Sequence, residues 1–152
     1  MNGSTATAIE AAGFPPPESL SQKAQIQWVR VVPISRLSPW QVDALKMVFK
    51  LASLPENWDT YGSRPPTRIA VETAIGVITQ VDLEELPAPY VVPVPGGGIQ
   101  LEWVADDREL ELEVLPEGGI AYLKAKGDES PIEGELPLTA HSELTSLLAW
   151  LR

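Results

Sequence analysis

Six glutamates in the C-terminal half of the sequence are spaced so that they could act together. Between residues 99 and 136, short runs alternate glutamate with apolar residues. Successive side chains of a β-strand point to opposite faces of a sheet, so glutamates two residues apart share one face. A face of this kind attracts cations and basic proteins and repels phosphates. The residues concerned are Glu102, Glu109, Glu111, Glu113, Glu133 and Glu135.

Three interpretations of these glutamates are open. They could form a solvated face that keeps the protein soluble, with Lys124 and Lys126 bridging neighbouring strands. They could also dock a basic protein. Cation binding is the third interpretation, although extended strands make a poor cage, because calcium sites draw several oxygens from one looping segment.

A second candidate site is the short segment 57–64, which holds two aromatic residues, an acid and an arginine. Tryptophan and tyrosine are favoured anchors at protein interfaces, so the segment could bind a partner. The aromatic rings could instead plug the end of the core, with Asp59 accepting hydrogen bonds from backbone amides and Gly62 taking a positive φ. The candidate binding residues are Trp58, Asp59, Tyr61 and Arg64.

The sequence contains no pattern typical of catalysis or of cofactor binding. The single histidine, His141, has no predicted local partner, and no G-x-S-x-G motif is present. Gly96–Gly98 precedes a predicted strand rather than a helix, and no Lys-Ser or Lys-Thr pair follows it, so a turn explains it better than a phosphate loop. The chain has no cysteine, which excludes disulfides and thiolate chemistry. We therefore expect no enzymatic activity, no metal site and no cofactor.

Length and composition predict one folded domain. A chain of 152 residues buries roughly 70% of its unfolded surface. Hydrophobic residues make up 44% of the sequence and charged residues 21%, which is typical of soluble globular proteins. Apolar runs stay well short of the roughly 18 residues that span a bilayer, and the N-terminus lacks the features of a secretory signal. We expect a cytoplasmic protein without membrane association.

The formal net charge of -10 is concentrated in one half of the chain. Residues 1–80 contain seven basic and six acidic residues, whereas residues 81–152 contain four basic and fifteen acidic residues. An acidic surface repels nucleic-acid phosphates, so direct DNA or RNA binding is not expected. The expected partner is another protein with a basic surface; the sequence leaves the oligomeric state open.

The N-terminal part contains a predicted tail and a predicted strand. Residues 1–22 are rich in small residues and proline without a period of two or 3.6, which is typical of a flexible tail. Residues 24–34 alternate up to Pro33, which favours a strand that ends there or lies at an edge, joined to this sheet or to another chain. We expect residues 23–152 to form a single domain.

Three helices are expected around the sheet. Ser38 as N-cap, Pro39 at the first position and Gln41 as the capping-box partner predict a helix that runs to about residue 52. A second helix is expected over about 67–81, and a leucine-rich one over about 139–151. The predicted apolar face of the first helix is Val42, Leu45, Phe49 and Ala52, with Val48 beside them; that of the second is Val71, Ala74, Ile75, Ile78 and Val81.

The turns predict how the strands pair. A two-residue turn at Asp106-Asp107 sets apolar residues opposite each other and places Glu102 opposite Glu111. Counting through the next two turns sets Lys124 opposite both Glu111 and Glu133. Lys124 and Lys126 are therefore expected to lie among the glutamates. The predicted pairs are Trp103 with Leu110, Leu101 with Leu112, Ile99 with Val114, Leu112 with Leu123, Glu109 with Lys126 and Ala125 with Ile132.

These expectations combine into an α+β fold. It is an antiparallel meander of four strands, which residues 24–34 and 90–94 could extend to five or six, packed on one face by about three helices. Two motifs stand out in the sequence, Asn57-Trp58-Asp59-x-Tyr61-Gly62 and Pro93-x-Pro95-Gly96-Gly97-Gly98-Ile99-x-Leu101-Glu102-Trp103. They resemble motifs of a group of small uncharacterised acidic bacterial proteins without an established activity, and the resemblance implies a bacterial origin.

The function expected from the sequence is that of a non-catalytic protein interaction module. Its acidic face or its aromatic loop would bind a basic protein, as an antitoxin, immunity or defence-accessory protein does. Two alternatives stay open. The carboxylates could imitate a nucleic-acid backbone and block a DNA- or RNA-binding protein. The segment Trp58–Arg64 could instead form the site of a small enzyme.

Overall fold

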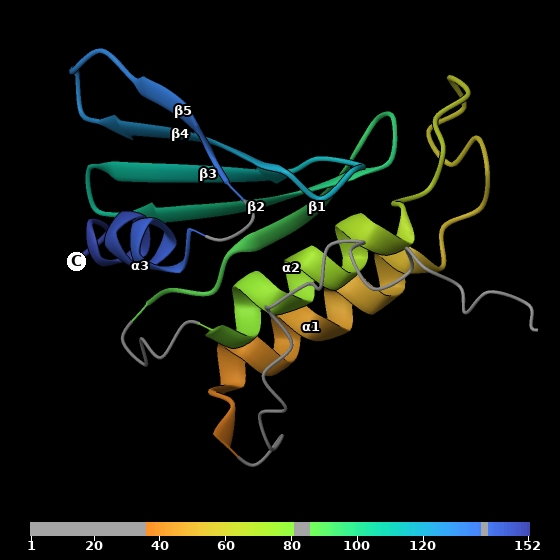
Figure 1. The fold of residues 1–152 in the computed structure, drawn as a ribbon, viewed down its shortest axis with the longest axis horizontal. Helices are drawn as coiled ribbons and strands as arrows, with labels where there is room; N and C mark the ends of the chain where they lie inside the picture. Colours follow the sequence, from red (N-terminus) through yellow and green to blue (C-terminus); the bar gives the residue numbers. More distant parts are fainter. Residues whose placement is uncertain (1–35, 81–85, 138–139) are drawn as a thin grey trace, which may run out of the picture.

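The computed structural model describes residues 36–80, 86–137 and 140–152, and within them the fold is α+β, with five antiparallel strands and three helices (Figure 1). The predicted tail over 1–22 and the predicted strand over 24–34 lie outside the described residues. The elements are α1 (Pro39–Ala52), α2 (Arg68–Gln80), β1 (Tyr90–Val94), β2 (Gly98–Ala105), β3 (Arg108–Val114), β4 (Ile120–Lys126), β5 (Ile132–Leu136) and α3 (His141–Ala149).

Helix α1 begins where its capping residues predict. The backbone N–H of Ser38 donates to the side-chain oxygen of Gln41 at 2.8 Å, which satisfies a donor that helix geometry leaves unpaired. The amide nitrogen of Gln41 donates in turn to the carbonyl of Ile78 in α2, also at 2.8 Å, in a buried position. The side chain of Gln41 therefore both caps the start of α1 and bonds α1 to α2. The two helices run side by side (Figure 1).

The buried face of α1 differs from the predicted one. Phe49, expected in the core, is 57% exposed, and Ala52 is exposed as well. The helix carries two apolar stripes; the one that begins at Trp40 packs into the core, and Gln41, next to it, bonds to α2 on the same side. The side chains buried along this helix are Trp40, Gln41, Ala44, Val48 and Leu51.

The five strands follow one another across the sheet in the order β1-β2-β3-β4-β5. The pairing of β2 with β3 is the predicted one, including Glu102 opposite Glu111 and Trp103 opposite Leu110. Its turn places Asp106 at φ 55°, a left-handed conformation that aspartate tolerates better than most residues.

The predicted pairing of β3 with β4 is wrong by one residue. Glu111 lies opposite Leu123 instead of Lys124, and Leu112 lies opposite Tyr122. The reason is the turn, in which the N–H of Gly118 donates to the carbonyl of Leu115 while the N–H of Leu115 donates to the carbonyl of Gly119. Gly118, at φ 94°, takes the left-handed position of a three-residue loop and so adds one residue to the count.

The pairing of β4 with β5 is also shifted by one residue, because Lys124 lies opposite Ile132. A one-residue shift moves a strand's side chains to the other face of a sheet. The shift between β3 and β4 and the shift between β4 and β5 cancel for β5, so Glu133 and Glu135 lie on the face that was predicted for them. Strand β4 undergoes only one of these shifts, so Lys124 and Lys126 lie on the face opposite to the one predicted. The face that holds the glutamates therefore lacks their positive charges.

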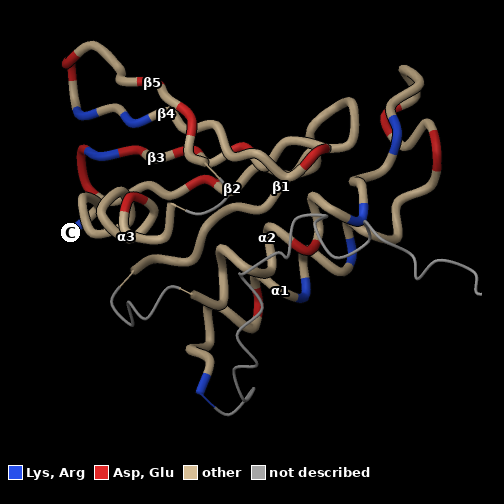
Figure 2. Tube along the Cα trace, in the orientation of Figure 1, with Lys and Arg blue, Asp and Glu red and all other residues tan. Residues whose placement is uncertain are grey.

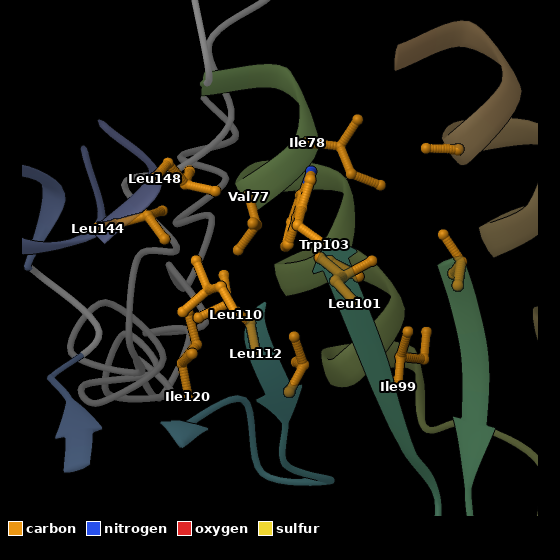
Figure 3. Packing of buried hydrophobic residues seen from close by; sticks show 14 of the residues in the cluster. Val77, Ile78, Ile99, Leu101, Trp103, Leu110, Leu112, Ile120, Leu144 and Leu148 are labelled. Carbon is orange, nitrogen blue, oxygen red and sulfur yellow. The ribbon is translucent and has the colours of Figure 1, made fainter. Parts of the chain in front are cut away.

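The core lies on the side of the sheet that carries the alternate residues of β2 and β3. Val77 and Ile78 of α2, together with Leu144 and Leu148 of α3, converge on the apolar side chains of these strands (Figure 3). Complete burial of such side chains contributes roughly 1.5–3 kcal/mol each to stability. The strand residues at the centre are Ile99, Leu101, Trp103, Leu110, Leu112, Val114 and Ile120, all at most 1% exposed.

Candidate functional site

All six glutamates singled out in the sequence lie on one face of the sheet, which we call the carboxylate face. One cross-strand row runs from Glu102 through Glu111 and Leu123 to Glu133. The next row runs from Gln100 through Glu113 and Ala121 to Glu135, and Glu109 lies opposite Val104 and Ala125. Residues directly opposite each other share a face, so the register alone brings the carboxylates together. Figure 2 shows the acidic positions along these strands.

Lys124 and Lys126 do not lie among these glutamates, which corrects the sequence-based expectation. Lys124 lies opposite Leu110 and Lys126 opposite Arg108, so both lysines point to the face that holds the core. Within the described strands, the carboxylate face therefore carries no lysine or arginine. Bridging of the glutamates by these two lysines is excluded.

The basic side chains are held instead by the C-terminal segment. The guanidinium of Arg108 lies 5.6 Å from the ring centroid of Trp150, and the ammonium of Lys124 lies 5.3 Å from it. Arg108 also donates a hydrogen bond to the carbonyl of Trp150 at 2.5 Å. Cation–π contacts of this kind contribute about 0.5–1 kcal/mol at exposed sites. The cations of β3 and β4 therefore help to fix the chain end that follows α3.

Gln100 is a residue of the carboxylate face that the sequence interpretation missed. Its amide nitrogen donates to a carboxylate oxygen of Glu102 at 2.9 Å and to one of Glu111 at 3.3 Å. It thereby places a neutral donor between two like charges that lie opposite each other. The signal was available in the sequence, because Gln100 alternates in phase with Glu102.

Glu111 occupies the centre of the carboxylate face and has a perturbed acidity. Partial burial raises the pKa of its carboxyl, and the negative charges of Glu102, Glu109 and Glu113 raise it further. Repulsion among these groups is therefore built into the folded state at neutral pH. Binding of a cationic group at this point would relieve it.

A hollow of about 440 Å³ lies on this side of the sheet. It is lined by residues of β2 to β5, including Gln100, Glu111, Glu113, Glu133 and Glu135. Four of these five side chains carry carboxylates. The hollow could therefore receive a lysine or arginine side chain, whereas an acidic group would be repelled.

Exposed apolar side chains border the carboxylates on the same face, and these too were missed. Tyr90 of β1 lies opposite Glu102 and is 69% exposed, and Val92 lies opposite Gln100. Val104 lies opposite Glu109 and is 53% exposed. Interfaces combine apolar anchors with polar groups, so this face offers more than charge.

The loop at residues 57–64 is closed by its own hydrogen bonds. The carboxylate of Asp59 accepts from the N–H groups of Tyr61 and Ser63 and from the hydroxyl of Ser63, and the indole N–H of Trp58 donates to the carbonyl of Arg64. The hydroxyl of Ser63 and these two amides hold the pKa of Asp59 below its usual value. Trp58 and Asp59 thus have structural roles in the loop.

Tyr61 and Arg64 are placed differently from Trp58 and Asp59. Tyr61 is 92% exposed, so the expectation that its ring plugs the core is wrong, and Arg64 is exposed too. Asn57 and Thr60 adopt φ values of 60° and 66°; asparagine tolerates this left-handed conformation, whereas a β-branched residue such as Thr60 adopts it at a cost of about 1–3 kcal/mol. The loop therefore presents Tyr61 to solvent on a strained and tightly bonded turn; Figure 1 shows this loop, at the yellow part of the chain, as a projection between α1 and α2.

The imidazole Nδ1 of His141 lies 2.6 Å from the side-chain oxygen of Gln80, which links α3 to the end of α2.

Among the described residues, no group of histidine, aspartate or glutamate side chains is arranged to hold a metal ion. Within the same ranges, no helix has the length and apolar character needed to cross a membrane. Comparisons of the chain with protein-family models, with curated proteins and with solved structures found no match.

Proposed function

We propose that this protein is a non-catalytic interaction module whose carboxylate face binds a basic protein. The observation that carries the proposal is the separation of charge across the sheet. Six glutamates share one face, while Lys124 and Lys126 lie on the other. A face tuned only for solubility would mix both signs of charge. Here the acidic charge is left uncompensated by neighbouring strands.

The proposal includes a specific arrangement of the layers. The five strands form a meander, and the three helices cover the core face only, so that the carboxylate face stays free for a partner. Support comes from side-chain exposure: Ile99, Leu101 and Trp103 are buried against helical residues, while Tyr90 and Val104 on the opposite face are more than half exposed. The proposed location is the cytoplasm, whose reducing conditions suit a chain without cysteine.

The chemistry of this face defines the partner. It should present lysine or arginine side chains to the centre, near Glu102 and Glu111, and apolar side chains to the border around Tyr90 and Val104. Charge of this sign would speed association at low salt. A protein that neutralises a basic toxin or effector, in the manner of an antitoxin or immunity protein, fits this description.

The test compares two variants of equal net charge. E102Q/E111Q removes two carboxylates from the centre of the face, and E56Q/E117Q removes two exposed carboxylates elsewhere. Wild type and both variants are used as bait in lysates of the source organism at 50 and 150 mM salt, and the recovered proteins are identified by mass spectrometry. Binding of the recovered partner is then measured with purified proteins.

We expect wild type and E56Q/E117Q to recover the same basic protein, and E102Q/E111Q to bind it at least about tenfold more weakly, since close charge pairs at interfaces are worth 1.5 kcal/mol or more. Equal binding by all three baits would show that the partner uses another surface. Failure of wild type to recover a partner at either salt concentration would contradict the proposal.

A further inference from the structure

The two edges of the sheet differ in what their backbones offer to a further strand. In an antiparallel ladder, alternate residues direct their N–H and C=O groups to one neighbour, and the residues between direct theirs to the other side. The N–H of Leu115 donates to Gly119 across the β3–β4 turn, which fixes this alternation for the sheet. Carried through the register, it directs the backbone groups of Glu133 and Glu135 to the free edge of β5.

The same alternation directs the backbone groups of Val91 and Pro93 to the free edge of β1. Proline has no N–H, so this edge can donate through Val91 alone. Prolines at edge strands are a common device against unwanted pairing. Strand β5 has no proline between Ile132 and Leu136, and among the described residues its two outward N–H groups pair with no other strand.

The side chains around β5 indicate which strand would fit there. Glu133 and Glu135 point to the carboxylate face, where they line the hollow of about 440 Å³. On the other face, a second hollow of about 430 Å³ has a mixed lining, in which Tyr122, Leu136, Leu147 and Trp150 lie beside the charged side chains of Lys124, Glu135 and Glu143. Ile132, at the start of β5, is 53% exposed. An added strand would therefore meet carboxylates on one face, and on the other face mainly apolar and aromatic groups, with Lys124 and Glu143 among them.

A second copy of this chain is a poor occupant of the edge. Antiparallel pairing of two β5 strands about Gly134 would set Glu133 of each copy opposite Glu135 of the other, on the same face. Like charges directly opposite each other destabilise a sheet. Charge complementarity favours a strand that carries lysine or arginine at these positions.

We propose that the β5 edge binds an extended segment of the partner as a sixth strand, with basic residues at every second position and apolar residues between them. The basic side chains pair with Glu133 and Glu135, and the apolar ones lie beside Ile132 and the hollow under β4. This inference rests on the proposed function, because it specifies how the basic partner engages the acidic side of the sheet.

The probe is a synthetic peptide with the core Lys-Val-Arg-Val-Lys. In the proposed pairing, the N–H groups of its basic residues point to β5 and those of its valines point away. A peptide N-methylated at the arginine should lose binding, whereas one N-methylated at a valine should keep it. The two control peptides have the same charge and composition, so charge attraction alone cannot separate them.

The matched protein variants are Glu133→Pro and Glu133→Gln. Both remove the carboxylate, but only proline removes the outward N–H, and an edge position tolerates proline. We expect Glu133→Pro to bind the peptide about tenfold more weakly than Glu133→Gln, because a donor-acceptor pair is lost. Amide hydrogen exchange in the wild type covers the case in which the proline variant does not fold: peptide should slow exchange at Glu133 and Glu135.

Two other outcomes would overturn the inference, and they differ in what they imply for the proposed function. If the peptide binds and E102Q/E111Q weakens it, but N-methylation at arginine has no effect and exchange at Glu133 and Glu135 is unchanged, the carboxylate face binds without strand addition. If the peptide does not bind at 50 mM salt, strand addition by a basic segment is wrong, and the recovery of a basic partner in the bait experiment decides the proposed function separately.

Discussion

At the scale of single residues, Glu111 is the point where stability and the proposed binding oppose each other. Its carboxyl is partly buried, faces Glu102 across the strands and has Glu109 and Glu113 on its own strand. A carboxyl whose pKa is raised on folding makes the native state bind protons more readily than the unfolded state. The resulting contribution to stability is present at low pH and is lost as pH rises through the folded pKa.

The first prediction follows from this sign. Glu111→Gln should raise the free energy of unfolding by about 0.5 kcal/mol at pH 7, because it removes a like-charge pair across strands. The gain should vanish near pH 3, where the carboxyls are protonated. Urea denaturation at both pH values measures it, with Glu117→Gln, an exposed turn position, as a control that should gain less than Glu111→Gln at pH 7. A loss of stability at pH 7 would contradict the repulsion.

Single residues also show why the sequence could not decide between a structural and a binding role for the loop at 57–64. Its composition suited either a plug or an anchor, and the structure divides the roles: Trp58 and Asp59 bond within the loop, while Tyr61 is exposed. The deciding bonds depend on backbone conformations such as φ 66° at Thr60, which threonine rarely adopts. Sequence propensities could not predict that conformation.

At the scale of elements, the helix bounds and the β2–β3 pairing were predictable, because capping residues and a two-residue turn define them locally. The β3–β4 register was not, since four residues at 116–119 fit either count until Gly118 is known to be left-handed. The buried face of α1 was missed for a different reason. Two apolar stripes compete there, and contacts with the rest of the core select one, with the bond from Gln41 to Ile78 among them.

The second prediction concerns the start of β2. A Cβ atom added at Gly98 would lie 2.8 Å from the carbonyl oxygen of Val114, a backbone atom of the neighbouring strand. Gly98→Ala should therefore cost about 1–3 kcal/mol, since the strands must separate. Gly119→Ala is the control, because its Cβ would meet only the Leu115 side chain at 3.4 Å. Thermal or urea denaturation compares them, and equal costs would show that the strands adjust freely.

At the scale of the whole molecule, the charge distribution sets the response to salt. The net charge is -10, and the described residues contain two ion pairs within the distance of a salt bridge, both on helices. Repulsion between carboxylates should therefore outweigh attraction between opposite charges in the folded state. Salt screens this repulsion, because the Debye length is about 10 Å at an ionic strength of 0.1 M.

The third prediction is that sodium chloride stabilises this protein. The midpoint of thermal unfolding should rise between 10 and 300 mM salt, and it should rise less in E102Q/E111Q than in E56Q/E117Q, which has the same net charge. Differential scanning calorimetry measures both effects. A midpoint that falls with salt would mean that attractive ion pairs dominate.

The proline at the β1 edge also limits what can be built from this molecule. The β5 edge offers two outward amides and the β1 edge only that of Val91, because Pro93 withholds an amide from whatever approaches that side, so strand addition is favoured at β5. Stacking of many copies into fibrils is therefore disfavoured at both edges, by Pro93 at β1 and by the facing glutamates of two copies at β5.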